Sequence, residues 1–168
     1  ISPNVVSAET VDQEATKDVF FKVNTELYAF DQFDLKYNRP DIVLERLGYA
    51  SVEKIESFRR AYEKRLQKMG FTEEMLKADF HLPEVSITNE DDLPVQFEDE
   101  KLSIKINATD SKYPLDRINV WINNVPIYGI NGISLRDKNT QDFETAIELQ
   151  LNEGDNKIEV SVLNQAGA

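Results

Sequence analysis

The spacing of apolar residues changes at Pro83, and this change constrains the fold more than any other feature of the 168-residue chain. Before Pro83, apolar side chains recur every three or four residues, which is the spacing of an amphipathic helix. From Glu84 onward they recur at every second residue, which is the spacing of half-buried strands. The sequence therefore predicts an α+β protein, with a small helical subdomain followed by an antiparallel β-sandwich.

The N-terminal part is expected to contain a lead-in, an extended segment and a first helix. Residues 1–18 are polar and weakly patterned, which predicts a disordered lead-in. Residues 19–37 are rich in β-branched and aromatic side chains, which predicts one or two strands. The first helix is expected to use Asn38 as its cap and Pro40 in its first turn, and to end at Gly48 in the left-handed conformation.

A second, longer helix is expected between Ser51, which can cap its start, and Gly70, which stops it. A short third helix is expected from Thr72 to Asp79. The extended segment and the helices would form one domain over residues 19–83. The apolar face of the long helix comprises Val52, Ile55, Phe58, Tyr62, Leu66 and Met69.

Residues 84–168 are expected to form an immunoglobulin-like sandwich of about seven short strands, because turn signals separate the alternating segments. Asn123-Asn124 is typical of a tight hairpin turn, with Val125, Ile127 and Tyr128 in the return strand. Residues 152–156 are expected to form a hairpin loop before the last strand. The alternating apolar positions are Val85, Ile87, Leu102, Ile104, Ile106, Ala108, Ile118, Val120, Ile122, Phe143, Thr145, Ile147, Leu149, Leu151, Ile158, Val160 and Val162.

The net charge of −12 is carried mainly by the second half of the chain. Residues 1–83 have 15 acidic and 12 basic side chains, or −3, whereas residues 84–168 have 16 and 7, or −9. An acidic surface repels phosphate groups, so neither nucleic acid nor an anionic membrane is expected as a partner. Membrane insertion is not expected either, because the chain has no apolar stretch long enough to span a bilayer.

The residues that usually carry chemistry are scarce, and no catalytic, cofactor or metal site is expected. The chain has no cysteine and a single histidine, His81, which we expect to be a packed residue at the junction of the two halves. The acidic runs 90–92 and 98–100 lack the spacing of a calcium loop and are expected to be exposed turns. The serines lack the surroundings of a nucleophile elbow, so the protein is not expected to be an enzyme.

Two surfaces could make contacts with other molecules. A basic face on the long helix could dock an acidic partner or could simply face solvent; it comprises Arg59, Arg60, Lys64, Arg65 and Lys68. Four aromatic residues, Tyr113, Trp121, Tyr128 and Phe97, could form a platform for a sugar or could pack in the core. The residues that we expect to make interactions are Arg39, Arg60, Lys64, Trp121 and Tyr128.

Three stretches resemble parts of a known arrangement. Residues 27–44 (LYAFDQFDLKYNRPDIVL) resemble a linker in large proteins of Bacteroides-like bacteria, which join a β-propeller of tryptophan-aspartate repeats to a caspase-like peptidase. Residues 115–129 (LDRINVWINNVPIYG) and 154–167 (GDNKIEVSVLNQAG) resemble the segment that precedes the peptidase, and the latter also resembles bacterial immunoglobulin-like modules. The chain contains neither the propeller nor the His/Cys pair of the peptidase.

The resemblance implies a non-catalytic interdomain module that positions a caspase-like peptidase relative to a propeller in a bacterial protein. Its expected partners are these adjacent domains, and it could be cytoplasmic or exported. The alternative is a surface module that binds a glycan or a protein through sandwich loops such as 113–116 and 130–140.

Overall fold

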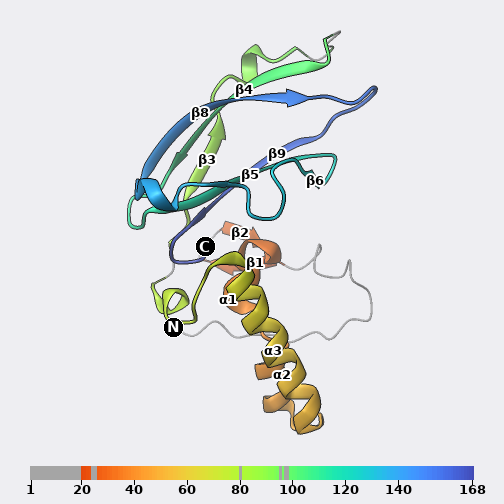
Figure 1. Cartoon of the computed structure of the whole chain (residues 1–168), viewed down its shortest axis with the longest axis vertical. Helices are drawn as coiled ribbons and strands as arrows, with labels where there is room; N and C mark the ends of the chain where they lie inside the picture. Colours follow the sequence, from red (N-terminus) through yellow and green to blue (C-terminus); the bar gives the residue numbers. More distant parts are fainter. Residues whose placement is uncertain (1–19, 24–25, 80, 95, 97–98) are drawn as a thin grey trace. The chain divides into compact units, whose positions relative to one another are not determined.

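The structure is a computed structural model that describes residues 20–168, except 24–25, 80, 95 and 97–98 (Figure 1). The chain divides into two compact units, one ending at Leu76 and one formed by Lys77–Ala168. Residues 77–83 belong to the second unit, where the carbonyl of His81 accepts a hydrogen bond from Asn164. The lead-in expected over residues 1–18 lies outside the described residues.

The described part of the first unit, from Phe20, starts with a β-hairpin and continues with helices. The hairpin confirms that the extended segment contains strands, and its two strands pair from Phe20↔Ala29 to Val23↔Glu26. The elements are β1 (Phe20–Val23), β2 (Glu26–Ala29), the 3₁₀-helix η2 (Phe30–Phe33), α1 (Asp34–Tyr37), α2 (Pro40–Leu47) and α3 (Val52–Met69). The 3₁₀-helix η3 (Met75–Lys77) follows, and its last residue belongs to the second unit.

The ends of the long helix α3 are formed by the residues expected from the sequence. The Ser51 hydroxyl accepts the backbone N–H of Lys54 at 3.3 Å, which pairs one of the free donors at the helix start. At the other end Gly70 has φ 73°, the left-handed conformation that glycine adopts without strain. Gly48 closes α2 in the same way, with φ 71°.

Two expectations about the helices are wrong. Asn38 does not cap α2, because the cap position is Arg39 and the Asn38 amide instead donates to the carboxylate of Asp34 at 2.6 Å. The helix expected from Thr72 to Asp79 is only a 3₁₀ turn, η3, over Met75–Lys77. The Thr72 hydroxyl nevertheless accepts a hydrogen bond from the N–H of Met75, as a helix cap would. The side chains of Asn38 and Thr72 thus both form local hydrogen bonds, but neither bond starts an α-helix at the expected residue.

Helices α2 and α3 lie against each other, with the buried side chains of Leu44, Tyr62 and Leu66 in the first unit. The expected apolar face of α3 is therefore buried at these C-terminal positions. Its N-terminal residue Val52 is 67% exposed, and Ile55 and Phe58 are half-buried.

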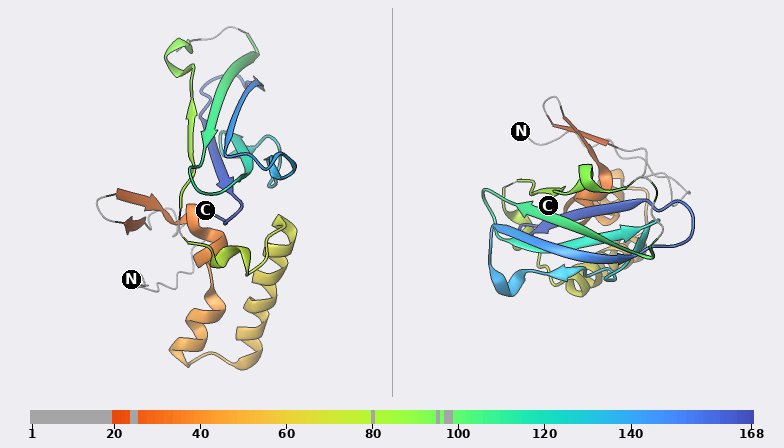
Figure 2. Two further views of the ribbon diagram at one scale, coloured as in Figure 1. Left: turned by 90° about the vertical axis from the view of Figure 1, so that its left-hand side faces the viewer. Right: turned by 90° about the horizontal axis from the view of Figure 1, so that it is seen from above.

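The second unit is built from two antiparallel sheets, so the coarse prediction of an α+β chain with a sandwich-like β-part is confirmed (Figure 1). Figure 2 shows these sheets lying one over the other. One sheet has the order β3-β4-β8, and in the other β5 pairs with β6, β7 and β9. The strands are β3 (Glu84–Ile87), β4 (Lys101–Thr109), β5 (Leu115–Ile122), β6 (Val125–Pro126), β7 (Ile133–Ser134), β8 (Asp142–Gln150) and β9 (Ile158–Asn164), with 3₁₀ turns η4 (Glu90–Asp92) and η5 (Arg136–Lys138).

The core of the second unit follows the period-two pattern. Along β4, buried and exposed residues alternate, because successive side chains of a strand point to opposite faces of the sheet. The buried core residues come from both sheets and from Leu135, which follows β7: Leu102, Ile104, Ile106, Ala108, Leu115, Ile118, Val120, Ile122, Leu135, Ile147 and Leu149.

The expected hairpin loop over residues 152–156 is wrong. Strand β8 pairs with β4, whereas β9 pairs with β5, so the loop crosses from one sheet to the other. The Asn156 side chain holds the crossing by donating to the carbonyls of Asn152 and Gly154. Both geometries use the same turn residues, and the sequence signal does not distinguish them.

The hairpin between β5 and β6 is confirmed at its turn. Asn123 and Asn124 both have positive φ, 51° and 65°, as a two-residue primed turn requires. The return strand is shorter than expected and contains only Val125–Pro126. The chain then turns at Gly129, whose N–H bonds to the carbonyl of Pro126.

Candidate functional site

Three polar side chains are buried in the second unit at positions that continue the inward-facing apolar series. Asp110 comes two residues after Ala108, and Asn164 two residues after Val162. Asp116 precedes Ile118 by two. At most 4% of each of the three residues is exposed. The burial of these three residues was not predicted, although the period-two spacing of each strand places them at the next inward position.

Asp110 and Asn164 join the ends of β4 and β9. The Asn164 amide donates to Asp110 Oδ2 at 2.9 Å and to the carbonyl of His81 at 2.8 Å. Its oxygen accepts the N–H groups of Ala166 and Ala168 at 3.0 and 3.1 Å. One orientation of the Asn164 amide satisfies all four hydrogen bonds. The amide thereby connects three segments of the chain: His81, the end of β4 at Asp110, and the C-terminal residues 166–168.

The carboxylate of Asp110 also builds the turn that leads into β5. Its Oδ1 accepts the N–H groups of Lys112 at 2.7 Å and Tyr113 at 2.8 Å. Burial alone would raise the pKa of Asp110, but the bonds from Tyr113, Asn164 and Lys112, together with the nearby His81, outweigh it and hold the pKa below its usual range. Asp110 is therefore a charged structural group.

The ring of His81 lies between Ser111 and Asp110, in the order of a serine hydrolase triad. Nε2 lies 3.0 Å from the Ser111 hydroxyl and Nδ1 lies 3.0 Å from Asp110 Oδ1. The second contact has the distance of an ion pair without hydrogen-bond alignment, so Nδ1 has no hydrogen-bond partner. Because orientation by the acid is what such a triad needs, we interpret His81 as a packed residue against Tyr113.

The second buried acid, Asp116, fixes a loop to the sandwich. Its carboxylate pairs with Arg117 at 2.5 Å and with Arg136 of η5, and Arg117 also donates to the Asn131 side chain. Gly132 approaches β5 so closely that a Cβ there would collide with the carbonyl of Ile118. The loop 130–138 is therefore held at both ends of its span.

Arg39, one of the expected contact residues, makes internal contacts in the first unit. Its guanidinium donates to both oxygens of buried Asp41, at 3.0 and 2.8 Å, and lies 3.9 Å above the Tyr62 ring. The hydrogen bond from Arg39 holds the pKa of Asp41 below its usual range, and the pKa of Arg39 is raised in return. About a fifth of the Arg39 side chain stays exposed.

The basic face of α3 is partly used within the first unit. Arg65, which is half-buried, donates to the carbonyl of Asn38 at 2.8 Å and pairs with Asp34. Arg60 and Lys64 remain exposed, and Arg60 lies 3.9 Å from Glu56 on the same helix. Exposed pairs of this kind contribute little stability, so Arg60 and Lys64 remain accessible to a partner, as does Lys68, which is also exposed.

Tyr113 and Trp121, two of the four residues of the expected aromatic platform, do not lie together. Tyr113 precedes the strand and lies against His81, whereas Trp121 is at its far end, roughly 25 Å along an extended chain. Trp121 is half-buried and faces Glu159 on β9 across the strand pair. Phe97 lies outside the described residues.

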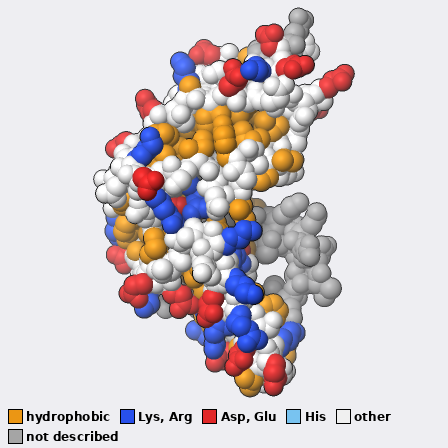
Figure 3. Space-filling model, in the orientation of Figure 1, with side chains coloured by type: hydrophobic (Ala, Val, Ile, Leu, Met, Phe, Trp, Pro, Cys, Tyr) orange, Lys and Arg blue, Asp and Glu red, His pale blue; other side chains and the backbone are white. Residues whose placement is uncertain are grey.

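Tyr128 belongs to a group of exposed apolar side chains that we call the β6 turn patch. The exposed fractions of Val125, Ile127, Tyr128 and Ile130 are 62%, 37%, 42% and 54%. These four residues lie within positions 125–130, around the turn at Gly129. Figure 3 shows that apolar side chains also gather on the same unit, between β8 and the strands β5 and β6.

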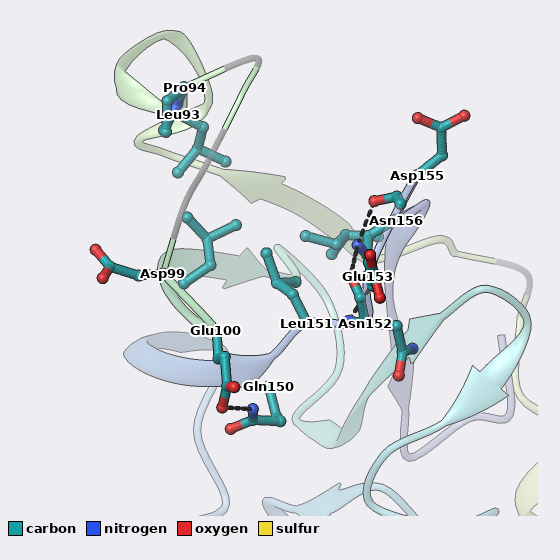
Figure 4. A pocket seen from close by; sticks show the side chains of 13 residues that line it. Leu93, Pro94, Asp99, Glu100, Gln150, Leu151, Asn152, Glu153, Asp155 and Asn156 are labelled. Atoms are coloured by element: carbon teal, nitrogen blue, oxygen red, sulfur yellow. Dashed lines mark hydrogen bonds between the residues drawn. The ribbon is translucent and has the colours of Figure 1, made fainter.

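A cleft of about 860 Å³ opens where β4 begins and β8 ends (Figure 4). Apolar side chains of Leu102, Leu151 and Ile158 line it, together with the acids Asp99, Glu100, Glu153 and Asp155. Asp99 and Asp155 point away from each other in Figure 4. Among the residues that the structure describes, no three potential metal ligands converge on one point.

Comparison with protein-family models, with curated proteins and with solved structures finds no match to this chain. In the described part of the chain, no helix combines the length and apolar character needed to cross a bilayer.

Proposed function

We propose that this chain is a non-catalytic interdomain module of a multidomain bacterial protein, which positions a caspase-like peptidase relative to a β-propeller. Its mechanism is rigid spacing combined with burial of apolar surface against the adjacent domains. The sequence resemblance in residues 27–44, 115–129 and 154–167 motivates these partners.

The observation that carries the proposal is the β6 turn patch. Apolar side chains are favourably removed from water by about 25 cal/mol per Å², so a cluster of exposed ones is typical of a contact surface. Buried Asp116 and Arg117 hold the following loop, which keeps the patch in a fixed shape. The ion pair of Asp116 and Arg117 thus holds the loop beside the β6 turn patch, whose apolar side chains are available for contact with another domain.

The finer fold type, immunoglobulin-like, belongs to the same proposal. It is supported by the sheet β3-β4-β8, by the pairing of β5 with β6, β7 and β9 in the other sheet, and by three crossings between the sheets, from β4 to β5, from β7 to β8 and from β8 to β9. Such crossings are typical of a Greek-key sandwich.

Calorimetric titration with the separately expressed downstream domain of the parent gene tests the proposal. We expect saturable binding that Ile130→Asp weakens at least about tenfold, because a charge in an apolar contact loses its hydration. Ala146→Asp is the matched control, since Ala146 is exposed on the outer face of β8. Absence of binding, or equal weakening by both variants, would contradict the proposal.

The alternative is a surface module that binds a glycan or protein ligand, and the cleft in Figure 4 favours it, because most ligand sites are concave. A ligand bound by the isolated chain and lost on Leu151→Asp would favour this alternative. If Trp121→Ala abolishes ligand binding and Leu151→Asp does not, the ligand binds at Trp121 and not in the cleft.

A further inference from the structure

Among the described residues, no strand forms ladder hydrogen bonds with the outer edge of β9, which pairs with β5 on its other edge. Toward β5, the bonds at the two ends of the pairing run from Gln165 N to Pro114 O and from Asn123 N to Lys157 O, both 2.9 Å. Since backbone groups alternate in direction along a strand, the odd-numbered residues of β9 bond to β5. The even-numbered residues point their N–H and C=O groups to the outside: Ile158, Val160 and Val162.

The chain itself forms the first hydrogen bond along this outer edge. Asn164 is the next even-numbered residue, and its N–H donates to the carbonyl of Ala168 at 2.9 Å. The chain reverses between them, with Gly167 at φ 81° and its N–H bonded to the carbonyl of Asn164. The Asn164 side chain holds this reversal through Ala166 and Ala168. Ala168 therefore lies where an antiparallel ladder along β9 would begin.

The edge also borders an apolar stripe. The side chains of Val160 and Val162 pack against the core but stay half-buried, and so do Val85 and Ile87 on β3. Strands β3 and β9 are neighbours although they belong to different sheets. A strand laid along β9 would cover both sets of side chains and pair the open backbone groups.

We propose that the outer edge of β9 is a docking site for an extended strand, antiparallel to β9, supplied by the polypeptide that follows Ala168 in a longer protein. A strand of this chain is favoured over a second copy, because Ala168 already occupies the first position of the ladder. About ten residues suffice, since β9 spans seven residues at roughly 3.3 Å each. The strand would carry apolar residues at alternate positions. This proposal does not depend on a propeller or a peptidase.

Amide hydrogen exchange, measured residue by residue by NMR, tests the edge in the 168-residue chain. We expect the amides of Val160 and Val162 to exchange at least about tenfold faster than those of Glu159 and Ser161, which bond to β5. The two sets lie on the same strand, so they control each other for global unfolding. Slow exchange of Val160 and Val162 at low protein concentration would overturn the proposal.

The second measurement adds the next ten residues of the parent gene after Ala168. We expect the exchange of Val160 and Val162 to slow at least about tenfold, while Ser161 is unchanged. A control extension carries proline at two positions whose N–H groups would face β9, and it should give no slowing. No slowing with the native extension overturns the proposal. If the amide exchange of Val160 and Val162 in the 168-residue chain slows as the protein concentration rises, the edge binds a second copy of the chain. That result would also overturn the proposal.

Discussion

Replacing Asn164 with alanine should strongly destabilise the second unit and leave the first unit unchanged. The substitution removes four hydrogen bonds, one of them to the charged carboxylate of Asp110. A neutral hydrogen bond contributes about 1 kcal/mol and a charge-assisted one about 2 kcal/mol. The N–H groups near Ala168 regain water in part, so we expect a loss of about 4 kcal/mol in the free energy of unfolding.

Urea denaturation monitored by fluorescence measures this loss, because Trp121 is the only tryptophan and lies on β5 in the second unit. Far-UV circular dichroism reports the helices α2 and α3 of the first unit. We expect the fluorescence transition to move to lower urea, with the helical signal unaffected.

Asn164→Asp is the matched variant, because it keeps the size and the accepting oxygen. It places a second carboxylate against Asp110, so its destabilisation at neutral pH should decrease as the pH falls and one of the two acids protonates. The loss in Asn164→Ala should show no such recovery. A loss below about 1 kcal/mol in the alanine variant, or a pH-independent aspartate variant, would refute the role assigned to Asn164.

Three further outcomes are expected. Asp41→Asn should destabilise the first unit by about 2 kcal/mol, seen by circular dichroism, because the partly exposed Arg39 guanidinium loses its charge-assisted hydrogen bonds to the carboxylate. Gly132→Ala should cost about 3 kcal/mol or more and Gly129→Ala only about 1 in denaturant titrations, because both have positive φ but only Gly132 has no room for a Cβ. The pKa of Asp110 is lowered in the folded chain, so the second unit should lose stability as the pH falls below about 4 and through that pKa. Asp110→Asn should flatten this pH dependence in fluorescence-monitored denaturation.

Local features of this chain could be predicted because their causes are local. The turn at Asn123-Asn124 and the helix end at Gly70 depend on backbone conformations that only a few residue types adopt without strain. The alternation in β4 follows from one strand against one core. Asp110 and Asn164 lie two residues beyond the apolar series of their strands, and this spacing indicates that their side chains point inward.

The candidate site was predicted less well than the elements. Arg39 was expected to contact a partner, but Asp41 and Tyr62 occupy its guanidinium. Its sequence neighbourhood showed an acid two residues away, yet not the ring that lies beneath it. Tyr128, by contrast, was expected at a surface and is exposed there.

The α+β order, the two ends of α3 and the inward-facing residues of each strand follow from the amino-acid sequence, because these features depend on neighbours within a few positions. The pairing of β8 and β9 in different sheets depends on the folded chain, and so do the bonds of Asn164 to His81 and Asp110, across 83 and 54 residues. The partners of β8 and β9 depend on which apolar faces are buried together, and the turn residues of 152–156 suit a hairpin and a crossing equally. A buried amide is stable only where its distant partners arrive, so its role exists only in the folded chain.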